Sequence, residues 1–253
     1  MDTVLITGTT SGIGEAFAKK FVLEGYNVIL VARNQEKLSL QAQKLGANKN
    51  VKYITCDLND ENAINIIEQS LKEWNLTVDI LINNAGFNEC GLFHETSINR
   101  ELEMVQVHIS SLIKLTKVLL KEMLKNNYGH IVNIGSTGSF IASPSDAVYS
   151  ATKSFILSFT NALAGELQGT GVKATIICPG ATNTKFAIKA GIEKTKLFGV
   201  AVMSANQVVD SVYCKLLRGK RVIIPGWYNR IMVACSKILP VSVLNKVTLW
   251  MMQ

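Results

Sequence analysis

Charged residues are scarce in this chain of 253 residues: they make up 18% of it, whereas hydrophobic residues make up 48%. This composition excludes a disordered or fibrous protein, because such chains bury too little apolar surface to form a core. No low-complexity linker, internal repeat or second domain is recognisable, and the length suits one α/β domain. We therefore expect a single folded unit.

Cysteine and histidine are also sparse, and neither forms a metal-binding pattern. The five cysteines include no Cys-x-x-Cys pair and do not alternate with histidines, so we expect no metal site. An odd number of unpatterned cysteines is typical of reduced, mostly buried thiols and predicts a cytoplasmic protein. A signal peptide and an apolar run of membrane-spanning length are not expected either, because a strand begins almost at Met1.

Acidic residues are outnumbered, with 19 Asp and Glu against 26 Lys and Arg and a formal net charge of +7. A basic balance suits nucleic acids, membrane surfaces or anionic small molecules. The lysines are scattered, without an arginine-rich run or a dense cluster, so we expect no nucleic-acid partner. Solvated helix faces account for most of the charge.

Apolar strands without polar alternation, separated by amphipathic helices, make up most of the chain. The predicted strands are 2–8, 28–32, 51–55, 78–82, 131–134, 172–178 and 222–225. The first predicted helix ends near residue 23, and the others cover 35–45, 60–74, 101–126, 149–167 and 206–217. The apolar positions of the helix over 101–126 include Leu102, Val105, Ile109, Leu112, Ile113 and Leu119. Residues 181–203 are expected to be a mobile loop with short helices. This order predicts a parallel sheet covered on both faces.

Tyr149 and Lys153 lie four residues apart at the start of a predicted helix, so they share one face. A free tyrosine titrates near pH ~10, and a neighbouring ammonium favours the phenolate and lowers that pKa. Carbonyl reduction and alcohol oxidation both need a group that exchanges a proton near neutral pH. The pair is therefore a candidate proton-transfer site, although Tyr-x-x-x-Lys alone is unspecific.

Gly8, Gly12 and Gly14 lie between the first predicted strand and the first predicted helix. A tight strand-to-helix turn needs glycine, and a pyrophosphate at a helix N-terminus needs close backbone approach and free N–H groups. The spacing differs from the usual G-x-G-x-x-G pattern. Its position at the first strand–helix junction nevertheless predicts a dinucleotide site rather than an ordinary turn.

The end of the second strand indicates which dinucleotide binds. An acidic residue there would bind the adenosine ribose and reject a 2′-phosphate. Here Ala32 is followed by Arg33, which can make charge-assisted hydrogen bonds to a phosphate. The sequence thus favours NADP(H) over NAD(H), with a surface arginine as the alternative. Asp57 is a candidate acceptor for the adenine amino group, or else a turn aspartate.

Together these motifs resemble those of the short-chain dehydrogenase/reductase family. The matching runs are Thr7-Gly8-x-x-x-Gly12-Ile13-Gly14, Asn83-Asn84-Ala85-Gly86, Ser136, Tyr149-x-x-x-Lys153 and Pro179-Gly180-x-x-x-Thr184. The resemblance covers residues 2–225 and implies a doubly wound Rossmann domain with a seven-stranded parallel sheet over 1–225. Residues 226–253 would be a helical extension of the same domain. The implied activity is hydride transfer between NAD(P) and a small-molecule carbonyl or secondary alcohol.

The resemblance also implies roles for single residues. Tyr149 would be the general acid in reduction or the base in oxidation, Lys153 would lower its pKa and bind the nicotinamide ribose, and Ser136 would bind the substrate oxygen. Asn83 would pack along the adenosine ribose. The implied cofactor-binding residues are Gly8, Thr10, Ser11, Gly12, Ile13, Gly14, Arg33, Asp57, Leu58, Asn84, Ala85, Gly86, Tyr149, Lys153, Pro179, Gly180, Thr182 and Thr184.

One position departs from the family pattern. The family usually has an asparagine in the long central helix, where it helps to hold a water in the proton relay to the lysine; here the residue is His108. Histidine can also hold a water, so we expect the relay and its catalytic role to persist. The alternative is an altered pH dependence or partial loss of the relay, because histidine can change charge near neutral pH. A dinucleotide-binding sensor or scaffold without turnover is the corresponding alternative to an enzyme.

Residues 226–253 are apolar, contain three basic residues and no acidic residue, and are split by Pro240 into two predicted helices. They resemble the extension of short-chain reductases that act on lipid-like ketones, which favours an apolar steroid-, acyl- or ketone-like substrate. We expect this tail to cover the substrate cleft or to pack on a partner subunit; the alternative is peripheral membrane contact. The family also implies a homodimer or homotetramer. Substrate contacts are expected from 88–97, 138–147, 181–203 and the tail.

Overall fold

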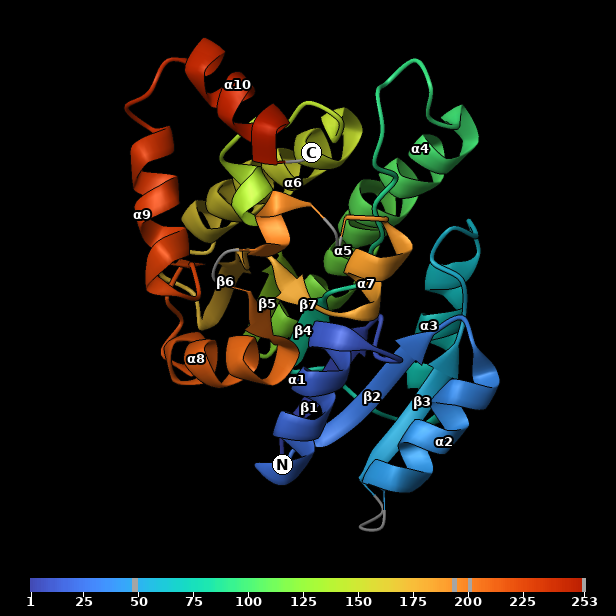
Figure 1. The fold of residues 1–253 in the computed structure, drawn as a ribbon. Helices are drawn as coiled ribbons and strands as arrows, with labels where there is room; N and C mark the ends of the chain where they lie inside the picture. Colours follow the sequence, from blue (N-terminus) through green and yellow to red (C-terminus); the bar gives the residue numbers. More distant parts are fainter. Residues whose placement is uncertain (47–49, 193–194, 200–201, 252–253) are drawn as a thin grey trace.

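Seven parallel strands form the central sheet of the computed structural model, which describes residues 1–46, 50–192, 195–199 and 202–251. Figure 1 shows helices on both sides of this sheet. The strand order is β3-β2-β1-β4-β5-β6-β9. The strands are β1 (Thr3–Thr7), β2 (Asn27–Ala32), β3 (Val51–Thr55), β4 (Ile80–Asn83), β5 (Gly129–Ile134), β6 (Val172–Ile177) and β9 (Val222–Ile223). The predicted seven-stranded Rossmann fold is confirmed.

Two apolar layers explain why the strands are hydrophobic throughout. Alternate residues of β1 point to opposite faces: Leu5 packs with α3 (Ala63–Glu73), α5 (Ser111–Lys125) and α6 (Ala147–Glu166). Val4 and Ile6 pack with α1 (Gly12–Leu23), α2 (Gln35–Leu45) and α8 (Ala205–Leu217). A strand buried on both faces has no solvent side for polar residues.

The position of the site follows from the strand order. β1 pairs with β2 on one side and with β4 on the other, so successive connections leave β1 in opposite directions. In an open α/β sheet, ligands bind at the carboxyl ends of the strands where the order reverses. Thr7 and Asn83, the last residues of β1 and β4, mark this point.

The predicted helix over 101–126 begins earlier and is not uniform. It consists of α4 (Ile98–Val105), a π-helical turn η1 (Gln106–Ser110) and α5. Two of its apolar positions, Leu102 and Ile113, are 59% and 37% exposed. The buried positions near the turn are Met104, His108 and Ser111 instead. π-helical turns are often found at functional sites.

Further differences concern element ends and the last third of the chain. α3 begins at Ala63 rather than at 60, because the Asp60 carboxylate accepts from Asn62 N at 2.8 Å and forms a turn. Within 181–203, the predicted short helices are present as α7 (Lys185–Lys189) and η3 (Lys196–Gly199). An unexpected two-stranded sheet joins β7 (Thr182–Asn183) to β8 (Met203–Ser204). The expected mobility of this segment stays a prediction.

The tail forms two helices, as predicted: α9 (Trp227–Ser236) and α10 (Val241–Met251), with Pro240 between them. In Figure 1 they lie on the side of the molecule away from α2 and β3. α10 contains no buried residue. Among the helices in the described part of the chain, none combines the length and hydropathy needed to cross a membrane.

The five cysteines are free, but the expectation of mostly buried thiols is only partly met. Cys56 and Cys178 are buried and Cys90 is half-buried, whereas Cys214 and Cys235 are exposed. Within the described ranges, no group of three or more His, Cys, Asp or Glu side chains could hold a metal ion.

Candidate active site

The glycine turn after β1 lies directly against the turn after β4. Gly8 has φ +70°, and a Cβ atom there would lie 2.8 Å from Ala85 Cα. A Cβ atom at Gly14 would lie 2.4 Å from both Gly8 O and Asn84 Nδ2. Both contacts are closer than packed atoms tolerate, so these positions require glycine. The backbone can therefore approach a ligand at the N-terminus of α1, where the helix dipole favours anions.

Thr7 holds the two turns together. Its Oγ1 accepts from the backbone N–H groups of Asn84 and Ala85, each at 3.0 Å. Asn84 Nδ2 donates to the carbonyl oxygens of Thr7 at 2.9 Å and Gly8 at 3.1 Å. The crevice at the reversal of the strand order is thus fixed by hydrogen bonds between the ends of its two strands.

A cavity of about 510 Å³ extends from this crevice over the ends of β2 and β3. Four of the predicted cofactor residues line this cavity and not the second one described below: Thr10, Arg33, Asp57 and Leu58. Arg33 Nη1 lies 3.6 Å from Asp57 Oδ2, with both side chains substantially exposed. Lys37 also lines this cavity and was not predicted. Lys37 lies in the first turn of α2, four residues after Arg33, and this position could have indicated it.

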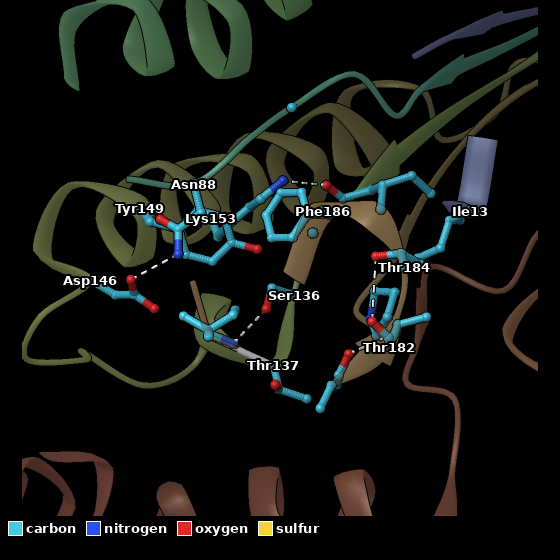
Figure 2. A pocket seen from close by; sticks show the side chains of 18 of the residues that line it. Ile13, Asn88, Ser136, Thr137, Asp146, Tyr149, Lys153, Thr182, Thr184 and Phe186 are labelled. Atoms are coloured by element: carbon cyan, nitrogen blue, oxygen red, sulfur yellow. Dashed lines mark hydrogen bonds between the residues drawn. The ribbon is translucent and has the colours of Figure 1, made fainter. Parts of the chain in front are cut away.

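A second cavity of about 250 Å³ opens on the other side of the glycine turn and is lined by Ser136, Tyr149 and Lys153. Ser136 follows β5 and caps η2 (Thr137–Ser139), its Oγ accepting from Gly138 N at 3.1 Å. Tyr149 and Lys153 come from the first two turns of α6, which begins two residues before Tyr149. Figure 2 shows the Ser136 and Tyr149 side chains directed toward the same space.

Most of the predicted cofactor residues line this second cavity. They are Gly8, Ser11, Gly12, Ile13, Asn84, Ala85, Gly86, Tyr149, Lys153, Pro179, Gly180, Thr182 and Thr184. Gly14 lines neither cavity and acts through packing. Asn83, which was predicted to pack along the ribose, lines neither cavity: its Nδ2 donates to Thr116 Oγ1 at 3.1 Å and to Asn133 Oδ1 at 2.9 Å, within the core.

The pKa of Tyr149 differs from the expectation. Burial raises the pKa of its phenol above the ordinary value, and the nearby Ser136 hydroxyl opposes this only in part. Lys153 Nζ donates to Ile134 O at 3.0 Å and lies 5.6 Å from the centre of the tyrosine ring. Burial lowers the pKa of Lys153 to about 8. In this structure burial decides the direction of the pKa shift, so Tyr149 is held as a protonated phenol.

His108 is buried behind Tyr149, with both ring nitrogens bonded to the protein. Its Nε2 accepts from Phe87 N at 3.1 Å, so Nδ1 carries the proton and donates to Thr152 Oγ1 at 2.9 Å. Burial, and then the charge of Lys153, hold the pKa of His108 well below its usual range. Neither ring nitrogen is therefore free to hold a relay water, and the role of His108 in the relay stays a prediction. The alternative of a charge change near neutral pH does not fit this environment either.

The ranges expected to contact substrate each contribute to the second cavity. Its further lining residues, which were not singled out from the sequence, include Asn88, Ile141, Ser143, Asp146, Phe186, Ile192, Phe198, Met232, Thr248 and Met251. Met232 comes from α9, and Thr248 and Met251 from α10, so the tail closes one side of the cavity. Asp146 and Asn88 form its polar wall, with Asn88 Nδ2 donating to Asp146 Oδ1 at 2.9 Å.

Comparisons with known proteins agree with this geometry. A family model described as short chain dehydrogenase matches residues 2–195. An uncharacterized oxidoreductase of Staphylococcus epidermidis is 31% identical over 86% of this chain and 92% of its own length. The NADP-dependent 3-hydroxy acid dehydrogenase of Escherichia coli is 37% identical over 70% of this chain and 71% of its own. A short-chain dehydrogenase from Sphingobium yanoikuyae in complex with NADPH superposes with a TM-score of 0.83, at 29% identity, over 94% of this chain and 95% of its own.

Proposed function

The chain belongs to the short-chain dehydrogenase/reductase family of dinucleotide-dependent oxidoreductases, and from this premise we propose that it uses NADP(H) to interconvert a carbonyl and a secondary alcohol beside Tyr149. One observation carries the proposal: Ser136, Tyr149 and Lys153 line a single cavity that continues into the glycine turn. The turn and the adenosine-side cavity suit a dinucleotide, and the three side chains suit proton transfer to an oxygen.

In the direction of reduction, Ser136 Oγ and the Tyr149 phenol would both donate hydrogen bonds to the carbonyl oxygen. The bound dinucleotide would supply the hydride to the carbonyl carbon. As negative charge develops on the oxygen, Tyr149 gives up its phenolic proton and the alcohol is complete. The raised pKa of Tyr149 suits this role, because the phenol is protonated at neutral pH. Oxidation would run through the same steps in reverse.

Lys153 would stabilise the phenolate that Tyr149 leaves behind. Its ammonium lies behind the tyrosine ring and is held by Ile134 O. With a pKa of about 8, it is largely charged at neutral pH. His108 would act by position: it links Phe87, in the turn after β4, to Thr152, in the tyrosine helix.

The preference for NADP(H) rests on the basic side chains of the adenosine-side cavity. Arg33 and Lys37 line it together, and neither β2 nor the residues that follow it up to Asn34 supply an acid for the ribose. Arg33→Ala should raise the dissociation constant of NADPH about tenfold, a typical effect for one exposed charge-assisted hydrogen bond. The constant for NADH should change less than twofold. Equal losses for both dinucleotides in fluorescence titrations would remove this argument.

Tyr149→Phe tests the proposed chemistry. It keeps the ring but removes the proton, so turnover of a ketone panel with NADPH should fall about 10²–10⁴-fold. NADPH affinity should stay within twofold, because the glycine turn is untouched. Normal turnover by this variant would contradict the proposal. Tight NADPH binding by the unaltered protein, with no turnover of any ketone or alcohol, would favour the sensor or scaffold alternative.

An apolar carbonyl compound is the proposed substrate. Six side chains of the cavity beyond Tyr149 are hydrophobic: Ile141, Phe186, Ile192, Phe198, Met232 and Met251. A relative named for 3-hydroxy acids makes anionic hydroxy acids a second candidate class.

Partners and location are part of the same proposal. We propose a homodimer or homotetramer through α5 and α6, which expose Ile113 and Phe155 at 37% and 36%. The outer face of α10 exposes Val243, Val247 and Trp250 beside Lys246, which suits peripheral membrane contact as a lesser alternative. Five free thiols are the ground for placing the protein in the cytoplasm.

A further inference from the structure

Two side chains that line the substrate cavity are charged at neutral pH, one positively and one negatively, and they lie on different sides of Tyr149. Lys153 is engaged with Ile134 O behind Tyr149. Asp146 precedes α6 and lies on the other side of the tyrosine, together with Asn88, in the view of Figure 2. The charge on the wall that faces the substrate is therefore negative.

Asp146 is not used as its position would suggest. It occupies the N-cap of α6, where an aspartate ordinarily accepts from a backbone N–H of the first turn, but its side chain makes no such bond. The carboxylate accepts from Asn88 Nδ2 at 2.9 Å instead. The loops that carry these residues are already joined by Gly91 N donating to Ser145 O at 2.8 Å. The carboxylate of Asp146 is therefore not needed to hold the two loops together.

The pair also has unused acceptor capacity. Asp146 is 8% exposed, and no cationic side chain of the described residues lies within ion-pair distance of it. Buried carboxylates are rarely left without a cation or a full set of donors. Asn88 is 6% exposed, and its Oδ1 atom is buried without a hydrogen-bond partner. The Asp146 carboxylate thus faces the cavity without a full set of donors, and Asn88 holds it in place.

We propose that Asn88 and Asp146 form a recognition site for a hydrogen-bond donor, a hydroxyl or an ammonium, on the carbonyl substrate, and that they exclude substrates carrying a carboxylate or sulfonate. The inference rests on the proposed function, because it places this donor in the same cavity as the reacting carbonyl. It narrows the substrate to an otherwise apolar ketone or aldehyde with one donor group.

The exclusion of anions follows from charge. A carboxylate at this wall would face another carboxylate in a desolvated setting, where like charges repel strongly. Lys153 is the only basic side chain among the described residues that line the cavity, and its ammonium is bonded to Ile134 O behind Tyr149. It is therefore not placed to neutralise an anion at this wall. A hydroxyl or ammonium would instead donate a hydrogen bond to the Asp146 carboxylate. Anionic hydroxy acids are therefore disfavoured as substrates.

Two ionisable groups are coupled to Asp146: Cys90, on the loop after β4, and Tyr149, on α6. Burial raises the pKa of Asp146 to about 6, so its charge is present at neutral pH. That charge in turn raises the pKa of Tyr149. Protonating Asp146 should weaken the exclusion of anions, and removing its charge should lower the pKa of Tyr149.

The test uses four ketones of similar size: butanone, hydroxyacetone, aminoacetone and pyruvate. Their kcat/KM values with NADPH and their dissociation constants for the NADPH-saturated protein are measured for the unaltered protein and for Asp146→Asn. Glu95→Gln is the control, because it removes one exposed charge from the loop that carries Asn88. The unaltered protein should prefer hydroxyacetone and aminoacetone to butanone about tenfold and should use pyruvate least. Asp146→Asn should abolish the preference for aminoacetone and improve pyruvate about tenfold, whereas Glu95→Gln should change neither ratio.

A second arm of the test varies the pH. The ratio of pyruvate to butanone kcat/KM in the unaltered protein should rise as the pH falls below about 6, the pKa of Asp146. Because both substrates use the same catalytic groups, dividing by the value for butanone removes the pH dependence of those groups. In Asp146→Asn the ratio should be flat and the limb of the rate profile due to Tyr149 should move to lower pH.

The outcomes separate the two proposals. Turnover of butanone with equal ratios in the unaltered protein and Asp146→Asn would overturn the recognition site and leave the proposed function standing. NADPH binding without turnover would overturn the proposed function, and the ketone dissociation constants would then decide on the recognition site. A protein that binds none of the four ketones would overturn the recognition site as well. NADPH affinity and the unfolding midpoint of each variant confirm that it has folded.

Discussion

The two ends of the cavity are built by different means. At the cofactor end, backbone turns after β1 and β4 meet so closely that Gly8 and Gly14 admit no side chain. Strands buried on both faces hold these turns in place. At the substrate end, single side chains from α9, α10 and several loops make the wall. α10 reaches this wall without burying any of its residues.

The difference shows which end can vary. A backbone crevice cannot change without moving the strands beneath it, so the cofactor end is suited to one invariant ligand, the dinucleotide. A wall of side chains on lightly packed helices can be altered one residue at a time. Substitutions in the glycine turn should therefore affect folding and cofactor binding together, whereas those at the substrate end should change selectivity without loss of folding or of cofactor binding.

The largest effect on folding is expected at the glycine turn. In Gly14→Ala the new Cβ would lie 2.4 Å from Gly8 O, a backbone atom that cannot move away alone. The free energy of unfolding should fall by about 3 kcal/mol, with NADPH affinity lost in parallel, as measured by urea unfolding and fluorescence titration. Gly165→Ala is the matched control: it lies in α6 with no atom within 4 Å of its Cβ position, so it should stabilise the protein by about 0.5–1 kcal/mol. A stable Gly14→Ala protein with normal affinity would break the comparison.

His108, between the two ends, should have the next largest effect. His108→Ala leaves Phe87 N–H and Thr152 Oγ1 without the ring, which should lower the free energy of unfolding by about 2 kcal/mol. Because the imidazole is neutral and both its nitrogens are occupied, the shape of the pH–rate profile should not change. A displaced limb in that profile would show that His108 belongs to the proton relay after all.

Asp146→Asn should stabilise the protein at neutral pH but not below pH 3.8. The pKa of Asp146 rises from 3.8 to about 6 on folding, so between these values the folded protein binds more protons than the unfolded chain. Stability due to this group is complete below pH 3.8 and is lost as pH rises through about 6. The asparagine variant suffers no such loss, so it should be more stable than the unaltered protein at pH 7.5 and equally stable at pH 3.5. Chemical unfolding at the two pH values checks this, and an equal difference at both would contradict it.

The smallest effect on stability is expected from removing residues 241–253. α10 has no buried residue, so its loss should change the free energy of unfolding by less than about 1 kcal/mol. The KM for ketones should rise several-fold, because Thr248 and Met251 no longer close the cavity. NADPH affinity should be unchanged. Loss of folding or of cofactor binding would mean that the tail supports the core.

The same contrast explains how much the sequence predicts. The strands of the cofactor end were predicted within a few residues, because buried parallel strands need long apolar runs and the turn needs glycine. The π-helical turn at 106–110 was not predicted, since the apolar spacing around it is compatible with an unbroken α-helix. Asp146 and Asn88 were missed because their burial and pairing depend on two loops that meet only in the folded protein.

The pKa of Tyr149 shows a second limit. Its spacing from Lys153 correctly predicts a shared cavity, and a charge four residues away does favour the phenolate. The pattern contains no information on how deeply the ring is buried, and burial decides the direction of the shift. The prediction of a lowered pKa was therefore wrong, although the pairing was correct.

The most direct test of the proposed function follows the hydride itself. NADPH carrying deuterium on the reactive face of nicotinamide C4 is incubated with the protein and the ketone panel, and the alcohols are analysed by mass spectrometry. We predict that a ketone of the panel is reduced to an alcohol bearing one deuterium on its carbinol carbon, and that this product is lost with Tyr149→Phe while NADPH binding persists. Tight binding of NADPH without a deuterated alcohol from any ketone would contradict the account.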